Sequence, residues 1–326
     1  MRRLLACCLL TASLTAGEAD PLAALPMPPR PLPASHASAP WDPLSGTQLA
    51  PGVRLVPGER VVLEGAFQVD KGPVDGLEVL ACLREGKTHE TLIRLIASDG
   101  ALIKAAGLAA FGLPDGRPAE ESRGVPARGT PVRLTLLWRD EDGGWRSADA
   151  ATLVRDRGTD RAFPPLPWVW TGSRMVLVTE NGPDGKPVRR ERFMLDSTRS
   201  VAVNYDEPDA LLASPFPCAS EDQRFEANSA IAPPPRTVVH LAITRAETVL
   251  ELRLAADGGL AAGAGPLDDA ALTTALAAAF AKPVHHAITV RTAAGVGDDL
   301  VVAARKRLLA IASAAQVWAV PLFTAE

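Results

Sequence analysis

Two proline-rich breaks decide how this chain can be divided into folded units. The first covers residues 20–57, which contain PLAALPMPPRPLPASHASAPWDPL, and the second is IAPPPR at residues 231–236. Sequence of this composition favours extended, polyproline-like chain and cannot supply a hydrophobic core. We therefore expect a tether over residues 20–57, a first domain over residues 58–235 and a second domain over residues 236–326.

Residues 1–19 have the pattern of a secretory signal peptide. Two arginines, at positions 2 and 3, precede an apolar run over residues 4–14, and a small-x-Ala sequence ends at Ala19. This order of charged, apolar and small residues is typical of a leader that is cleaved on export. The apolar run is much shorter than the about 20 residues that span a bilayer. We expect cleavage near Ala19, no membrane span, and a mature protein that is periplasmic or secreted.

Composition and charge exclude one class of function. The chain is 47% hydrophobic and 22% charged, so it can bury an ordinary core, and its net charge is −4. Such a chain lacks the basic field that attracts nucleic acid. Aromatic residues, which would stack on bases, make up only 5% of the chain. We therefore expect no nucleic-acid partner.

Between the two breaks the sequence predicts mainly strands. Segments rich in β-formers, bounded by Gly, Pro and Asp clusters, cover residues 61–67, 77–83, 89–96, 132–138, 168–172 and 175–179. One helix is expected over residues 99–111, with Asp99 or Ser98 as its N-cap and Gly112 as its stop. Because the strands come in runs and do not alternate with helices, we expect an α+β fold whose first domain is mainly antiparallel with one helix.

The segment after the second break has a different pattern. Two strands, TVVHLAI and VLELRLA, precede an alanine-rich helix over residues 268–281 that begins with acidic capping residues. A strand (HAITVR), a second helix (GDDLVVAARKRLLAIASA) and a last strand (VWAVPL) follow. The order ββαβαβ predicts a small domain with two helices on one face of its sheet.

The stretch ACLREGKTHETL, residues 81–92, allows three interpretations. The first is a nucleotide-binding loop, because the stretch fits the relaxed pattern A-x4-G-K-T. Such a loop needs glycine-rich backbone that points its N–H groups at phosphates and then enters a helix. Here a second glycine is missing, Glu85 would lie among the phosphate oxygens, and a strand-like segment follows. We therefore reject a nucleotide site.

The second interpretation is a metal site, and the third is a plain β-hairpin. In a hairpin whose turn is centred on Glu85-Gly86, Cys82 lies directly opposite His89, close enough to share an ion. Glu90 points to the other face, because side chains alternate along a strand. Cys82 and His89 remain an alternative as metal ligands, but tetrahedral zinc needs three or four. We expect a hairpin and no cofactor.

A polar site on this hairpin is the candidate binding site. It consists of Lys87, His89 and Glu90, and the alternative is that His89 and Glu90 make only structural hydrogen bonds. Other catalytic arrangements are not recognisable. The sequence TGSRM at residues 171–175 lacks the second glycine of a nucleophile elbow, and the paired acids stand at helix starts, where capping explains them.

Removal of the leader leaves two cysteines, Cys82 and Cys218. In the oxidising compartment of an exported protein, one pair of cysteines can form one disulfide. A bond between positions so far apart would close a long loop. We therefore consider a Cys82–Cys218 disulfide, with two unbonded, buried thiols as the alternative.

Residues 74–232 resemble the YdjY-like domain of exported proteins, notably those of planctomycete-type bacteria. The matching text is LEVLAC, GKTHETLIRL, ALIKAAGLAAFGL, WVWTGSRM and FEANSAIAPPPRTVVHLAI. The run G-K-x-H-E is its most specific part. The family has no assigned biochemical role, so the resemblance implies no catalytic residue.

Residues 237–324 are similar to the periplasmic domain of the ExbD/TolR family. The agreement lies in ELRLAADGGL, LDDAALTTALAAAFA, HAITVR and GDDLVVAARKRLLAIASAAQVWAVPL. Thr292-Ala293 stand where family members often carry an acidic residue after the arginine equivalent to Arg291. The family's membrane helix, with its proton-carrying aspartate, also has no counterpart. The resemblance implies an exported interaction module that can form a homodimer through the C-terminal domain, and it does not imply energy transduction.

These features favour an exported, non-enzymatic protein that binds an envelope protein or a cell-wall component. The alternative is an envelope hydrolase or metalloprotein in which His89 and Glu90 act with partners that the fold brings near. The two differ in one structural respect, because a catalytic pair should line a pocket with polar groups from distant strands.

Overall fold

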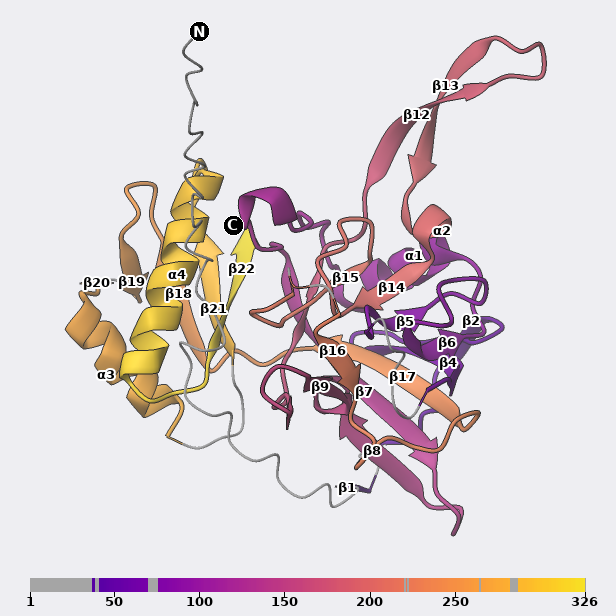
Figure 1. Ribbon diagram of the computed structural model, residues 1–326, viewed down its shortest axis with the longest axis horizontal. Helices are drawn as coiled ribbons and strands as arrows, with labels where there is room; N and C mark the ends of the chain where they lie inside the picture. The colour runs from indigo at the N-terminus through magenta and orange to yellow at the C-terminus, as the bar shows by residue number, and fades with distance from the viewer. Residues whose placement is uncertain are drawn as a thin grey trace, which may run out of the picture.

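The computed structural model describes residues 37–38, 41–69, 76–219, 221, 223–263, 265–281 and 287–325. Within them the fold is α+β, with a large, mainly antiparallel sheet and a smaller sheet flanked by helices (Figure 1). This confirms the predicted fold class. The predicted signal peptide and residues 20–36 of the predicted tether lie outside the described residues. None of the described helices is long and apolar enough to cross a membrane.

The large sheet closes on itself. Its strands are β1 (Ala37–Ser38), β2 (Thr47–Ala50), β3 (Val53–Val56), β4 (Arg60–Phe67), β5 (Val79–Cys82), β6 (Thr91–Leu95), β7 (Thr130–Arg139), β8 (Trp145–Asp149), β11 (Trp168–Trp170), β14 (Ser200–Val203), β15 (Leu212–Ala213) and β17 (Val238–Arg245). They are hydrogen-bonded in the order β1-β8-β7-β11-β15-β14-β5-β6-β4-β3-β2, and β17 pairs with both β4 and β7. The path from β4 to β7 is therefore closed by β17 into a barrel-like ring.

The structure places β17 in this ring. The sequence prediction, which assigned this strand to the second domain, was wrong on this point. Residues 239–243 of the strand are buried, and a strand covered on both faces lacks the alternation of polar and apolar residues that would indicate its neighbours. The prolines before it do not form a linker. They lead the chain directly onto the end of β4, where Arg236 N donates to Phe67 O (2.7 Å) and Phe67 N donates to Thr237 O (3.0 Å).

Part of the predicted tether is folded as well. β2 and β3 form a hairpin, and β3 continues the large sheet by pairing with β4, so that Val53 lies beside Leu63. Val53 is buried in the core. The two strands flank Pro51-Gly52, a turn pair whose glycine has φ 76°. The proline-rich composition of the surrounding segment concealed this short hairpin.

The predicted hairpin over residues 81–92 is not formed. β5 and β6 are parallel neighbours, with Val79 beside Thr91 and Cys82 beside Arg94. All four residues of β5 are buried, and the strand lies between β14 and β6. A central strand needs partners on both edges, and here the second partner, β14, comes from far along the chain. Residues 83–90 form a loop that returns to the level at which β5 begins.

A second sheet follows at the C-terminus. It has the order β20-β19-β18-β21-β22, with β18 (Leu250–Leu254), β19 (Leu260–Ala262), β20 (Gly265–Pro266), β21 (Ala287–Thr292) and β22 (Val320–Ala325). The pairs β18–β21 and β21–β22 are parallel, and α3 (Asp269–Ala279) and α4 (Asp298–Ala314) lie in the connections. Right-handed crossovers that progress in one direction place both helices on one face, where they contact each other (Figure 1).

The remaining elements are short or project from the large sheet. They are η1 (Glu121–Arg123), η2 (Ala150–Leu153), β9 (Val154–Asp156), β10 (Arg161–Ala162), β12 (Met175–Asn181), β13 (Pro187–Phe193), α2 (Leu195–Thr198), β16 (Phe225–Ala227) and α1 (Gly100–Phe111). The helix predicted over residues 99–111 is confirmed as α1. Asp99 Oδ1 accepts a hydrogen bond from Leu102 N (2.9 Å), and Gly112, with φ 60°, ends the helix.

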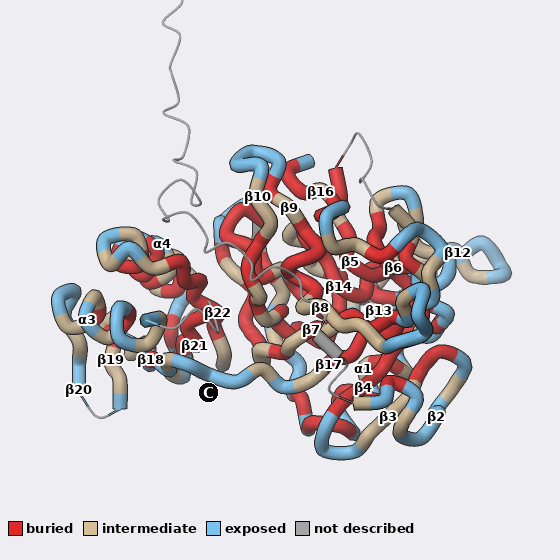
Figure 2. Tube along the Cα trace, turned by 90° about the horizontal axis from the view of Figure 1, so that it is seen from below, coloured by how far each residue is buried: buried red, intermediate tan, exposed pale blue. Residues whose placement is uncertain are grey.

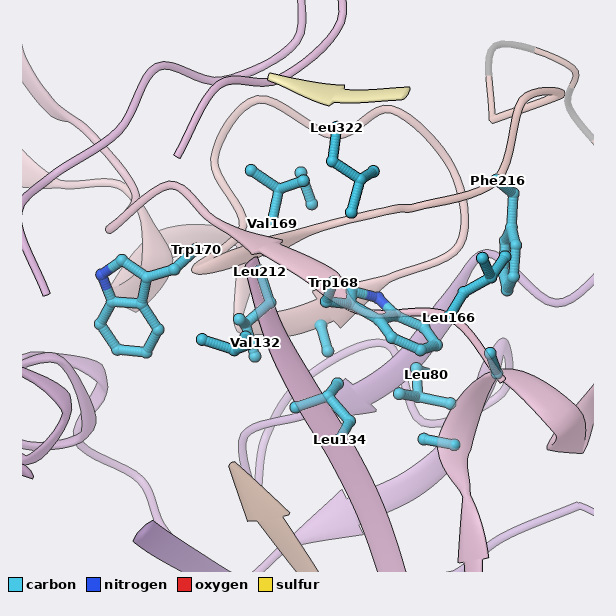
Figure 3. Close-up of a cluster of buried hydrophobic side chains, with 14 of the residues drawn as sticks. Leu80, Val132, Leu134, Leu166, Trp168, Val169, Trp170, Leu212, Phe216 and Leu322 are labelled. Atoms are coloured by element: carbon cyan, nitrogen blue, oxygen red, sulfur yellow. The ribbon is translucent and has the colours of Figure 1, made fainter. Parts of the chain in front are cut away.

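The two sheets meet along β22. Gly129 N donates to Phe323 O (2.9 Å), and Leu322 of β22 lies beside Val169 of β11, near Trp168 (Figure 3). Buried residues occupy both the large sheet and the space between α4 and the C-terminal sheet (Figure 2). One hydrophobic cluster includes apolar side chains of both sheets, and two smaller clusters contain other buried residues of the large sheet.

Candidate functional site

Four charged side chains meet beside the loop that connects β5 to β6. Glu78 precedes β5, Lys87 and Glu90 lie in the loop, and Glu207 lies in the loop after β14. Lys87 Nζ is 3.1 Å from Glu78 Oε2. Glu207 and Glu90 are also close enough to Lys87 to act on it through their charges. We call these four residues the Lys87 cluster.

The parallel pairing of β5 and β6 assembles this cluster. The loop after β5 must return to the level where β5 began, because β6 starts there and runs in the same direction. Val79 N therefore donates to Glu90 O (3.1 Å), which carries Glu90 next to Glu78. Thr91 Oγ1 donates to Lys87 O (2.5 Å), so the first residue of β6 holds the loop in place.

Asn204 holds the other side of the cluster. Its backbone N donates to Glu78 O (2.7 Å), and its Nδ2 donates to Leu77 O (2.9 Å). The residue is buried and lies directly after β14, which pairs antiparallel with β5. This antiparallel pairing brings the end of β14 to the start of β5, and the following loop carries Glu207 to the cluster.

The electrostatics of the cluster show a surplus of negative charge. Burial raises the pKa of Glu78, Lys87 lowers it by a hydrogen bond and by its charge, and Glu90 raises it. Burial likewise raises the pKa of Glu207, against the lowering effects of Ser200 and Lys87. Burial lowers the pKa of Lys87, but the carboxylates outweigh this effect and the pKa lies above its ordinary value. A single ammonium thus faces three carboxyls.

The structure brings the three predicted site residues together. His89 Nε2 lies 3.1 Å from Glu90 Oε1, and Glu90 adjoins the Lys87–Glu78 pair. The His89 side chain is 76% exposed, so it marks the open side of the cluster. Sequence reasoning missed Glu78 and Glu207. Glu78 lies within the predicted strand LEVLACL, where a single charged residue does not indicate a site. The only sequence signal for Glu207 is its place in the acidic run DEPD at residues 206–209.

Cys82 is not part of this site. It is buried and lies beside Arg94 in the register of β5 and β6, and not opposite His89 as the hairpin prediction required. Gly86 covers it so closely that a Cβ there would lie 2.7 Å from Cys82 Cβ. Among the described residues, no three His, Cys, Asp or Glu side chains are grouped so that they could hold a metal ion.

The disulfide considered from the sequence is not formed. Cys82 and Cys218 are both buried, and neither is bonded to another cysteine. They belong to separate clusters of buried residues. Burial raises the pKa of the Cys82 thiol, which keeps it in the unreactive, protonated form.

Comparisons of this chain with protein-family models, with curated proteins and with solved structures gave no match. The resemblance of residues 74–232 to the YdjY-like domain therefore stays a prediction. The same holds for the resemblance of residues 237–324 to the periplasmic domain of the ExbD/TolR family.

Proposed function

We propose that this protein is an exported, non-enzymatic binding protein of the cell envelope. Its Lys87 cluster binds a cationic group, an ammonium or a guanidinium, on an envelope protein or a cell-wall component. One observation carries the proposal: three carboxyls surround one lysine in a half-buried site, and the pKa of two of them is raised. A second cation would relieve this excess of negative charge.

The same observation predicts how binding depends on pH. A cation beside Glu78 and Glu207 favours their ionised form and so lowers the pKa of both carboxyls. By linkage, the affinity for the cation rises as the pH rises through the raised pKa values, because ionised carboxylates are the form that binds. A binding site for an anion would show the opposite dependence.

The test uses the methyl ester of Nα-acetyl-lysine as probe and its Nε-acetylated, neutral analogue as control. We expect the charged probe to bind, more tightly at pH 8 than at pH 5, and the neutral analogue not to bind. Glu207→Gln should weaken binding about tenfold, which is about 1.4 kcal/mol. Lys87→Met, which removes the internal cation, should strengthen it. Isothermal titration calorimetry measures the affinity of the native chain for both probes and that of the two variants for the charged probe.

Glu85→Gln is the matched control, because Glu85 is exposed in the same loop and lies outside the cluster. It should bind the probe as the native chain does. Equal binding of the neutral analogue, or native affinity in Glu207→Gln, would show that the Lys87 cluster is not the binding site.

The contact between His89 and Glu90 favours a second candidate function, an envelope hydrolase. A histidine 3.1 Å from a carboxylate can hold and release a proton, as general acid–base catalysis requires. Turnover of a cell-wall peptide or glycan that disappears in His89→Ala and Glu90→Ala, with the fold retained, would establish this function. The same result would refute the non-enzymatic proposal. Stoichiometric metal in the purified protein would support the metalloprotein version.

We also infer that the C-terminal sheet with α3 and α4 is a domain that begins at β18 and shares a hydrophobic cluster with the large sheet. The homodimer through this domain, which the ExbD/TolR resemblance predicts, remains a proposal. The edge of β22 is partly covered, because Gly129 N donates to Phe323 O. Such a dimer would therefore have to use the helices or the β20 edge.

A further inference from the structure

The strands β12 and β13 form an arm that projects from the body of the protein (Figure 1). They pair from Met175 beside Phe193 to Asn181 beside Pro187, and within the described residues no third strand joins them. The base of the arm is anchored by Met194 N, which donates to Arg174 O (3.0 Å). A two-stranded ribbon with both edges open is only marginally stable in water, so this arm is suited to pairing with a further strand.

The two edges of the arm differ in how they resist such pairing. β13, with the sequence PVRRERF, carries a proline and four charged residues, which are common devices against edge-to-edge association. β12, with the sequence MVLVTEN, has only one charge, at Glu180. Three of its residues, Val176, Val178 and Thr179, are β-branched and favour strands. The β12 edge is therefore the one that can accept a partner strand.

Apolar side chains on β12 are exposed to solvent. Met175 is 54% exposed and Leu177 is 57% exposed. Because directly opposed residues of an antiparallel pair lie on the same face, these two share a face with Phe193. The exposure of large apolar side chains on a free strand edge is a feature of protein-binding surfaces.

We propose that β12 pairs antiparallel with β12 of a second copy of this chain, about a twofold axis at Val178. Val178 then lies opposite the partner's Val178, Leu177 opposite the partner's Thr179, and Val176 opposite the partner's Glu180. No like charges are opposed in this register. The result is a four-stranded sheet made of two arms, in which the main chain supplies the hydrogen bonds and the two opposed Val178 side chains make the direct apolar contact.

Charge disfavours self-pairing through the other edge. An antiparallel pair of β13 strands centred on Arg190 would place Arg190 opposite the partner's Arg190, and opposed like charges are destabilising. Pro187 would also leave the ladder without a donor at the end of the strand. The sequence of the arm thus selects a β12–β12 dimer.

Two double variants of the full chain test the register. Leu177→Lys with Thr179→Lys places lysine opposite lysine at both symmetric positions, so it should weaken the dimer at least tenfold. Leu177→Glu with Thr179→Lys places opposite charges at the same two positions, so it should restore dimerisation to within about threefold of the native chain. Sedimentation velocity across a hundredfold range of protein concentration measures the dissociation constants.

Val188→Lys is the control on the other strand of the arm, and it should leave the dissociation constant unchanged. Circular dichroism and thermal unfolding show whether each variant is folded. A native chain that is monomeric at every concentration would overturn the proposal. So would a dimer that the lysine pair does not weaken, or one that the glutamate–lysine pair does not restore. Pairing with an extended segment of a different protein would appear as the first of these outcomes.

Discussion

Asp149 is a buried carboxylate whose charge is only partly compensated. Its Oδ1 accepts a hydrogen bond from Ala151 N (3.1 Å), and Arg133 Nε is 3.5 Å from its Oδ2. Burial outweighs these contacts and raises the pKa of Asp149 to about 7. Between about pH 4 and pH 7 the folded protein therefore retains a proton here that the unfolded chain, with a pKa of about 3.9, has already released.

The sign of the pH dependence follows from this retention. The stabilisation from the Asp149 proton is fully present below the unfolded pKa and is lost as the pH rises through the folded pKa. Asp149→Asn cannot titrate but keeps the oxygen that accepts from Ala151. Between pH 4 and pH 8, the free energy of unfolding of this variant should change with pH by about 4 kcal/mol less than that of the native chain.

Urea denaturation at steps of pH measures this difference. Asp142→Asn, at an exposed position in the β7–β8 turn, is the control and should keep the native pH dependence. The same slope in Asp149→Asn and in the native chain would contradict the assignment of this titration to Asp149.

The closure of the large sheet depends on how closely β7 approaches β11. The first residues of β7 pair with β11, and a Cβ added to Gly129, just before β7, would lie 1.9 Å from Trp170 O. This oxygen belongs to the backbone of β11, so it cannot rotate away as the end of a flexible side chain can. Only glycine fits this position.

Gly129→Ala should therefore lower the free energy of unfolding by about 3 kcal/mol or more, because β7 and β11 must move apart. Gly265→Ala is the control, since no described atom lies within 4 Å of the Cβ that it would add. Its effect should stay within about 0.5 kcal/mol. Equal midpoints of chemical denaturation for the two variants would refute this account of the contact.

Between the two sheets, Asp298 joins α4 to the segment that leads into β7. Arg128 forms an ion pair with it, and the guanidinium groups of Arg117 and Arg123 lie 3.2 Å and 3.1 Å from its carboxylate oxygens. Burial would raise the pKa of Asp298, but the charges of the arginines outweigh it, so the pKa lies below its ordinary value. The carboxylate stabilises the junction above the ordinary carboxyl pKa, and this stabilisation is lost as the pH falls through the lowered value.

Asp298→Ala should lower the free energy of unfolding by about 3 kcal/mol at pH 7, because it leaves the buried charge of Arg128 unpaired. Asp299→Ala, at the next residue of α4, should have an effect within about 0.5 kcal/mol, since its side chain is fully exposed. Chemical denaturation of both variants at neutral pH measures the difference. Similar losses of unfolding free energy in the two variants would mean that the ion pairs between Asp298 and the arginines do not stabilise this contact.

Several elements are predictable from local signals. Asp99 and Gly112 frame α1, and Asp268 begins α3 by accepting a hydrogen bond from Ala271 N (2.8 Å). These signals work because a helix makes its hydrogen bonds within itself, so its ends are decided by the residues next to them. Strands have no such signal for their partners. The residues of β5 are all apolar and those of β17 are mostly so, and neither sequence shows which strand lies beside it.

Local sequence signals were enough to predict the α+β class, both ends of α1 and a polar segment around Lys87. The tertiary structure decided that β5 and β6 are parallel, that β17 closes the large sheet, and that Glu78 and Glu207 complete the Lys87 cluster. The physical reason is the same in each case. Strand pairing joins backbone groups that are far apart along the chain, and buried strands have similar side chains regardless of which neighbour they bond.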